Sequence, residues 1–156
     1  MRAVLQRVSS ASVTVDGQVV GQIGSAATRE PKGLLVLFGV AGGDTDEDSA
    51  FLARKTVELR IFEDENGKMN KSLIEIGGAI LVVSQFTLIA DWRSGRRPGF
   101  SKAASPQEGE RLYLHYVDQL RQKQIPVQTG VFGADMQVAI QNEGPVTLIL
   151  DTREKA

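Results

Sequence analysis

The feature that most constrains the fold is a continuous apolar run from Gly33 to Val40, with Leu-Leu-Val-Leu-Phe in its middle. No polar residue alternates with the apolar ones, and this pattern is typical of a strand that is buried on both faces. A second apolar run extends from Ala79 to Ser84. We expect both runs to be buried strands.

The other predicted strands are short β-rich runs bounded by turn residues. The dipeptide Asp16-Gly17 separates two such runs and predicts a β-hairpin. Residues 24–32 and the polar residues 90–104 are predicted loops. The last two strands are predicted to be joined by a turn at 142–145. The predicted strands, apart from the two apolar runs, are 3–9 with 12–15, 18–23, 60–62, a continuation of the second run over 85–88, 136–141 and 146–151.

Two segments have the start signals of helices. Thr45 precedes three acids within 46–48, and this predicts an N-cap and a helix over 46–59. Ser105, Pro106 and Glu108 fit the N-cap, N1 and N3 positions of a second helix that runs to Lys123. Its apolar residues form one stripe, at 112, 113, 116, 117 and 120.

The number and close spacing of the strands predict an α+β fold. We expect a largely antiparallel, curved or barrel-like sheet with two helices packed outside, in a single domain over 1–156. No apolar run approaches the ~20 residues of a membrane span, and the N-terminus does not have the pattern of a signal peptide. The expected location is the cytoplasm, with no membrane contact.

The chain has no cysteine and one histidine, and this excludes disulfides, thiolate nucleophiles and zinc sites built on Cys or several His. Asp44, Asp46 and Asp48 resemble the start of a calcium loop. The pattern fails at Ser49, where that loop needs Gly, and at Lys55, where it needs Glu. We expect no metal and no cofactor.

The lone histidine, His115, lies on the second predicted helix among polar residues and opposite the apolar stripe. We expect a solvated surface histidine there. A hydrolase of the Ser-His-Asp type is therefore not predicted, since it needs a base beside its nucleophile.

Charge is unevenly distributed although the net charge is −1. Residues 41–75 hold nine acids and five bases, whereas residues 91–102 sum to +3. A small basic region in a near-neutral protein favours a local contact with phosphate over a general nucleic-acid coat. The bases are Arg93, Arg96, Arg97 and Lys102, against Asp91.

Two segments place polar groups where strands end. Ser84-Gln85-Phe86-Thr87-Leu88 follows the second apolar run, and Asn142-Glu143-Gly144-Pro145-Val146-Thr147 precedes the last strand. Proline cannot donate a ladder hydrogen bond, and glycine before it permits unusual backbone angles. Alone, each segment also fits an ordinary strand end or hairpin turn.

Together the two motifs closely resemble the D-aminoacyl-tRNA deacylases, which carry S-Q-F-T-L and N-x-G-P-V-T in this order. The resemblance covers nearly the whole chain. It includes Leu5-Gln6-Arg7-Val8, Ala11–Val15, Gly67–Asn70, Arg97-Pro98, Phe100–Lys102 and Ala134–Val138. One departure is several extra residues at 25–31, between the hairpin and the first apolar run.

The resemblance implies hydrolysis of the ester that joins a D-amino acid to the 3′-terminal adenosine of tRNA. It also implies a homodimer whose active sites lie at the interface, with a cis Gly144-Pro145 that enters the partner's pocket. The two carbonyls of this dipeptide would exclude an L side chain by collision. Glycine has no side chain to exclude, so glycyl-tRNA is an implied second substrate.

The resemblance places the catalytic groups in the first motif, at Ser84, Gln85, Phe86 and Thr87. Backbone N–H groups near Phe86 would hold the developing oxyanion. Two mechanisms stay open, one with Thr87 as nucleophile and one in which the adenosine 2′-OH assists water. Supporting residues implied by the resemblance are Arg7, Met136, Asn142, Val146 and Thr147.

With tRNA as the implied partner, the basic residues 93, 96, 97 and 102 are predicted to contact acceptor-stem phosphates. Trp92 would either stack on a base or anchor the loop. Two alternatives stay open: an RNA-binding module without catalysis, and an editing domain that hydrolyses an L-aminoacyl-tRNA.

Overall fold

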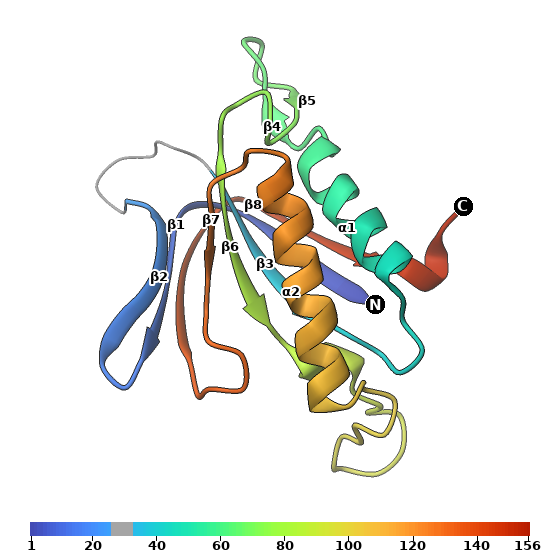
Figure 1. Ribbon diagram of the computed structural model, residues 1–156. Coiled ribbons are helices and arrows are strands. Elements are labelled where there is room, and N and C mark those ends of the chain that lie inside the picture. Colours follow the sequence, from blue (N-terminus) through green and yellow to red (C-terminus); the bar gives the residue numbers. More distant parts are fainter. Residues whose placement is uncertain (26–32) are drawn as a thin grey trace.

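The structure is a computed structural model, and it describes residues 1–25 and 33–156 (Figure 1). The prediction of a loop over 24–32 therefore lies almost entirely outside the described residues, as do the extra residues at 25–31. The elements of the described part are β1 (Arg2–Val15), β2 (Gln18–Gly24), β3 (Gly33–Gly39), α1 (Asp46–Glu58), β4 (Phe62–Glu63), β5 (Met69–Lys71), β6 (Ala79–Ser84), the 3₁₀ turn η1 (Phe86–Ile89), α2 (Pro106–Gln122), β7 (Val127–Thr129), β8 (Gln137–Asp151) and the 3₁₀ turn η2 (Thr152–Glu154).

Strand β1 organises the main sheet, because it pairs along both of its edges. One edge carries β3 over residues 2–8 and β2 over residues 10–15, and the other edge carries β8 along nearly its whole length. The sheet continues from β3 to β6 and β7, while β4 and β5 form a separate small hairpin. The chain is thus an α+β protein with one dominant, strongly bent sheet, as predicted.

The pairs of β1 are antiparallel, as predicted, but β3–β6 and β6–β7 are parallel. Parallel neighbours need a crossover connection, and a helix usually supplies it. Here α1 lies between β3 and β6 in the chain, and α2 lies between β6 and β7. Both helices cover the same face of the sheet (Figure 1).

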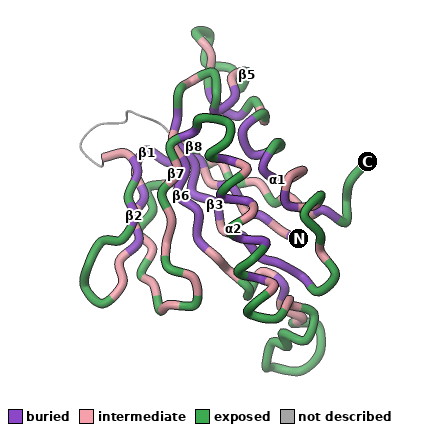
Figure 2. The backbone as a smooth tube through the Cα atoms, in the orientation of Figure 1, coloured by how far each residue is buried: buried purple, intermediate pink, exposed green. Residues whose placement is uncertain are grey.

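Two hydrophobic cores lie on opposite faces of β3 and β6. Leu34, Val36 and Phe38 pack with the helices, whereas Leu35 and Leu81 belong to a second cluster behind the sheet. All five side chains are buried, and the two strands are the most continuously buried part of the tube in Figure 2. The prediction of strands buried on both faces is confirmed.

The second core forms because β1 buries a different set of side chains before and after residues 7–9. Residues 3 and 5 pack with the helices, residues 11 and 13 pack in the second cluster, and residues 7–9 are all buried. Beyond this point β1 and β2 fold back over the sheet. A Cβ on Gly21 of β2 would lie 2.4 Å from the carbonyl oxygen of Thr129 in β7, so the two strands touch and nearly close the sheet into a barrel.

The predicted helix starts are confirmed. Thr45 caps α1 in a capping box with Asp48, and the Ser105 side chain accepts a hydrogen bond from the N–H of Glu108. His115 differs from the expected solvated residue. It is half-buried, and its Nδ1 lies 2.9 Å from the hydroxyl of Ser49, because α1 packs against this side of α2.

Three strand predictions are wrong in detail. Residues 85–88 do not continue β6, because the chain turns into η1. Residues 142–145 are not a turn between two strands, since β8 is continuous from Gln137 to Asp151. The strand predicted at 60–62 is β4 at 62–63, and the short strands β5 and β7 were not predicted. Within the described residues, no helix is long and apolar enough to cross a membrane.

Candidate active site

Two cavities lie beside η1 in the described chain, and the larger of them opens where β3 and β6 end, at the start of α2. Its volume is about 580 Å³, within the range that holds a small organic ligand. Its walls are mainly apolar and aromatic. Its lining includes Ser84, Gln85, Phe86, Phe100, Tyr113 and Met136.

Three residues of the first motif reach this cavity. The N–H of Gln85 donates to the carbonyl of Phe38 at 2.8 Å, and the chain then enters η1. Phe86 and Thr87 begin this turn, so their N–H groups have no carbonyl partner inside it. Thr87 itself is exposed and is not among the lining residues, and Gln85 Nε2 hydrogen-bonds its hydroxyl.

Close packing holds the motif against β3. A Cβ on Gly39 would lie 2.8 Å from the carbonyl oxygen of Gln85 and 3.0 Å from the Cβ of Leu88. Only glycine therefore lets η1 approach the end of β3 this closely. This close approach positions the motif together with the hydrogen bond from Gln85 to Phe38.

Aromatic side chains form much of the cavity wall. Phe86 and Phe100 meet edge to face, with ring centroids 5.0 Å apart. Tyr113 and Phe132 meet deeper in the wall at 5.8 Å. Tyr113, Phe100 and Phe132 were not singled out as site residues, because in the sequence they are part of a helix stripe or of loops. Met136, predicted as a supporting residue, does line the cavity.

The cavity wall contains one ionisable side chain, Tyr113. Burial raises the pKa of Tyr113 to about 12, and its hydroxyl donates to the carbonyl of Val82 at 3.1 Å. It is therefore a neutral hydroxyl at pH 7, not a base. The described residues of the wall include no histidine, carboxylate or lysine that could remove a proton from water or from a hydroxyl.

The second motif forms a wide bulge in β8. Gln6 pairs with Thr147 and Val8 pairs with Asn142, so four residues, 143–146, stand opposite one, Arg7. The Gly144-Pro145 peptide bond is cis, and Gly144 has a φ of +121° that L residues rarely adopt. The chain leaves the sheet and returns in the same direction, and this is why the predicted turn is absent.

Arg7 and Asn142 hold the bulge through hydrogen bonds to its backbone. Arg7 is buried, and it donates from Nη1 to the carbonyl of Ile61 at 2.8 Å and from Nε to the carbonyl of Glu143 at 3.3 Å. Asn142 Nδ2 donates to the carbonyls of Arg7 and Val146, at 2.9 and 3.2 Å. These bonds fix both ends of the bulge.

The structure does not bring the two motifs together within one chain. Ser84 pairs with Phe38, and Phe38 pairs with Ala3, four residues from Arg7 along β1. At ~3.4 Å per residue this is about 14 Å along the strand direction, and the strands between the two motifs add to the separation. No residue of the second motif lines the cavity.

Comparison with known proteins agrees with the motifs. The family model described as D-Tyr-tRNA(Tyr) deacylase matches residues 4–151. The chain belongs to this deacylase family. It is 56% identical to the D-aminoacyl-tRNA deacylase of Syntrophotalea carbinolica, over 99% of both chains, and 58% identical to that of Ruegeria pomeroyi, over 97% of this chain and 99% of the other. Among solved structures, the c-Myc DNA Unwinding Element Binding Protein is similar, with a TM-score of 0.88 and 41% identity over 97% of this chain and 99% of that one.

This member of the deacylase family also has a smaller cavity, of about 220 Å³, on the other side of η1. Two of the four predicted phosphate ligands, Arg93 and Lys102, line it, and both form ion pairs with Asp91. Arg96 and Arg97 lie elsewhere on the exposed loop.

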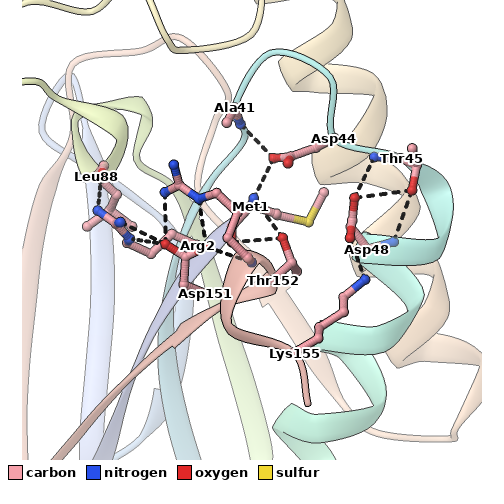
Figure 3. A network of polar contacts seen from close by, with 11 residues as sticks. Met1, Arg2, Ala41, Asp44, Thr45, Asp48, Leu88, Asp151, Thr152 and Lys155 are labelled. Atoms are coloured by element: carbon pink, nitrogen blue, oxygen red, sulfur yellow. Dashed lines mark hydrogen bonds and ion pairs between the residues drawn. The ribbon is translucent and has the colours of Figure 1, made fainter.

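Arg2 connects this smaller cavity to η1. Its Nη1 donates to the carbonyl of Leu88 at 2.7 Å, and its Nε and Nη2 donate to Asp151 (Figure 3). Arg153 binds the same carboxylate, with Nη2 at 2.8 Å from Asp151. Sequence analysis missed Arg2 and Arg153, because they are about 90 and 50 residues from the basic loop in the chain. Among residues 1–25 and 33–156, no group of three His, Asp or Glu side chains is placed to hold a metal ion.

Proposed function

We propose that this chain, acting as one deacylase domain over residues 1–156, hydrolyses the ester bond of D-aminoacyl-tRNA in the cytoplasm. Membership of the deacylase family supports the reaction. The observation that carries the details is the cavity beside η1, which has an apolar wall without a general base and the first turn of η1 at its edge.

The catalytic step relies on position and electrostatics. The N–H groups of Phe86 and Thr87 would bind the carbonyl oxygen as negative charge develops on it, while Ser84 and Gln85 shape the rim. Because the wall offers no base to activate Thr87, we propose that the 2′-OH of the terminal adenosine assists the attacking water. An ester is a reactive bond, so alignment alone supplies much of the rate.

We propose that the complete site forms in a homodimer. Gly144-Pro145 does not line the cavity of its own chain and lies about 14 Å along the strand direction from the level of Ser84, so it would act in the cavity of a partner. Strand β8 supports this, because it pairs only with β1 among the described strands and exposes Ile140 and Ile149. An exposed strand edge with apolar side chains favours association with a second copy.

Selectivity would then come from exclusion. A rigid dipeptide, held by Arg7 and Asn142 and flanked by Val146 and Thr147, would leave space for the hydrogen of a D-residue's α-carbon but not for an L side chain. Glycyl-tRNA would be accepted, because glycine carries no side chain on either side. Phosphates of the acceptor stem would contact Arg93, Arg96, Arg97 and Lys102.

The test measures amino-acid release from D-tyrosyl-, L-tyrosyl- and glycyl-tRNA in parallel, with a chelator present. We expect fast loss of the D and glycyl esters and no acceleration with the L ester. Loss of the L ester at a similar rate would contradict exclusion by Gly144-Pro145. Loss of none of the three, with tRNA still bound, would replace the deacylase proposal by an RNA-binding module.

The role of Thr87 needs its own pair of substrates. Thr87→Val is expected to keep most of the rate on D-tyrosyl-tRNA, whereas a 3′-ester on a terminal 2′-deoxyadenosine is expected to react at least tenfold more slowly with the unaltered protein. A large loss in Thr87→Val together with normal cleavage of the 2′-deoxy ester would identify Thr87 as the nucleophile instead.

A further inference from the structure

The smaller cavity gathers cations from distant parts of the chain. Arg2 comes from β1, Arg93 and Lys102 come from the loop after η1, and Arg153 comes from η2. Asp91 is the one carboxylate in the wall. The wall therefore carries a net charge of +3, or +2 when Asp151 behind it is counted.

The carboxylates orient Arg93 and Arg153 and leave one nitrogen of each guanidinium free. Arg93 uses Nε and Nη2 on Asp91, and Arg153 uses Nε and Nη2 on Asp151. The remaining Nη1 of each guanidinium has no partner among the described residues. A phosphate oxygen is the natural acceptor for such donors, because a charge-assisted bond to a guanidinium is strong and directional.

Backbone pairing fixes the loop that carries the acidic anchor. Asp91 and Gly99 exchange two backbone hydrogen bonds of 2.8 Å, and these close the loop between them. Hydrogen bonds from the side chain and N–H of Arg93, with a further one from Lys102, hold the pKa of Asp91 well below its usual range. Asp91 is thus ionised at any working pH, and its two partners stay in place.

The rim of the cavity adds a flat aromatic surface. Trp92 is 76% exposed and lies between the two charged residues Asp91 and Arg93 in the chain. An exposed indole beside a phosphate-binding group is the combination that single-stranded RNA binders use, with the backbone on the cations and a base on the ring.

The two cavities share one element. Phe86, at the start of η1, lines the larger cavity, and Ile89, at its end, lines the smaller one. Three residues of a 3₁₀ turn span about 6 Å along its axis. The smaller cavity is therefore within reach of the first few nucleotides of a strand whose terminal adenosine enters the larger one.

We propose that the cavity formed by Arg2, Arg93, Lys102 and Arg153 binds a backbone phosphate of the tRNA 3′ strand, with the adjacent base stacked on Trp92. This inference rests on the proposed function for the identity of the RNA. It adds two ligands, Arg2 and Arg153, that lie outside the basic loop, and it assigns Trp92 a role in binding.

The chain's single tryptophan provides the assay. Uncharged tRNA is titrated into the protein at several salt concentrations, and Trp92 fluorescence is recorded. We expect saturable quenching. Inorganic phosphate at the same ionic strength is expected to leave the fluorescence unchanged, because it brings no base to stack.

Arg153→Gln is the decisive variant, since only the side-chain bonds to Asp151 are lost and the N–H of residue 153 still donates to that carboxylate. We expect tRNA binding to weaken on the order of fivefold and the slope of log affinity against log salt to fall by about 0.7–0.9. Arg54→Gln is the matched control, an arginine of similar exposure that is paired with Glu58 on α1. It is expected to bind tRNA like the unaltered protein.

Three outcomes would overturn the inference. These are tRNA binding without any change in Trp92 fluorescence, equal affinity and salt slope for Arg153→Gln and Arg54→Gln, and equal quenching by inorganic phosphate. Cleavage of D-tyrosyl-adenosine, an ester that has no phosphate, tests the deacylase activity separately. Cleavage with no effect of Arg153→Gln on tRNA binding would contradict this inference alone, whereas the expected binding results without cleavage would contradict the proposed function alone.

Discussion

Replacement of Arg7 by methionine tests how the Gly144-Pro145 bulge is held. Methionine fills much of the same volume but has no donor. The carbonyls of Ile61 and Glu143 would lose their hydrogen bonds at 2.8 and 3.3 Å, and the ion pair with Glu63 at 3.9 Å would be lost as well.

The expected cost follows from these three contacts. The short, buried bond to Ile61 contributes about 2 kcal/mol and the longer bond to Glu143 about 1 kcal/mol, since hydrogen bonds to charged groups are worth ~1.5–3 kcal/mol at good geometry. The pair with half-exposed Glu63 adds at most ~0.5 kcal/mol. We therefore expect Arg7→Met to lower the free energy of unfolding by about 3 kcal/mol, or the melting temperature by roughly 6–12 °C.

Urea denaturation at one fixed protein concentration measures this loss, because association would make the stability depend on concentration. Arg7→Lys keeps the charge without the planar, forked geometry of the guanidinium. Its free energy of unfolding is expected to lie between those of the unaltered protein and Arg7→Met. Arg54→Met, on an exposed helix face, is the control and is expected to change stability by less than about 0.5 kcal/mol. A loss below 1 kcal/mol in Arg7→Met would refute the view that the guanidinium holds the bulge.

Three other substitutions test the contact beside η1, a buried hydroxyl pair and an arginine-bound carboxylate. Gly39→Ala is expected to lower the rate on D-tyrosyl-tRNA at least tenfold, since the new Cβ would push against the carbonyl of Gln85; an unchanged rate would show that this contact does not position the motif. Tyr116→Phe is expected to destabilise the chain by about 1 kcal/mol in urea, because its buried hydroxyl lies 2.7 Å from that of Thr56. Burial raises the pKa of Asp151, but hydrogen bonds from two arginines outweigh it and leave the pKa below its usual range in the folded state. The stability that Asp151 contributes is therefore present at neutral pH and lost as pH falls below about 4, so Asp151→Asn is expected to flatten the acid side of the stability curve; a curve parallel to that of the unaltered protein would contradict this.

Local chemistry made much of the fold predictable. The apolar runs of β3 and β6 contain almost no polar side chain that could face water, so burial of both faces was predictable. Both helix starts carry capping residues at defined spacings, and the structure uses them. The turn into η1 was not predictable in this way, since Phe86, Thr87 and Leu88 suit a strand as well as a 3₁₀ turn, and the close approach to Gly39 is a contact between distant residues.

The bulge in β8 shows a second limit. Residues 142–145 have the composition of a turn, and only the pairing of both flanks with β1 shows that the chain does not reverse there. The cations of the smaller cavity show a third limit. Arg2 and Arg153 meet because β1 and β8 are paired at Arg2 and Asp151, and no property of either local sequence indicates this neighbour.

The bend in β1 at residues 7–9 and the bulge in β8 lie at the same level, where the sheet passes from the core under the helices to the core behind it. Gly144-Pro145 thus lies where the sheet passes from one core to the other, and packed side chains lie on both sides of this junction. The tip of a loop is positioned by its own few contacts, but a segment at the junction of two cores moves only when the packing of a core changes. Substitutions within residues 143–146 are accordingly expected to change the chemical groups of this segment more readily than its position in the fold.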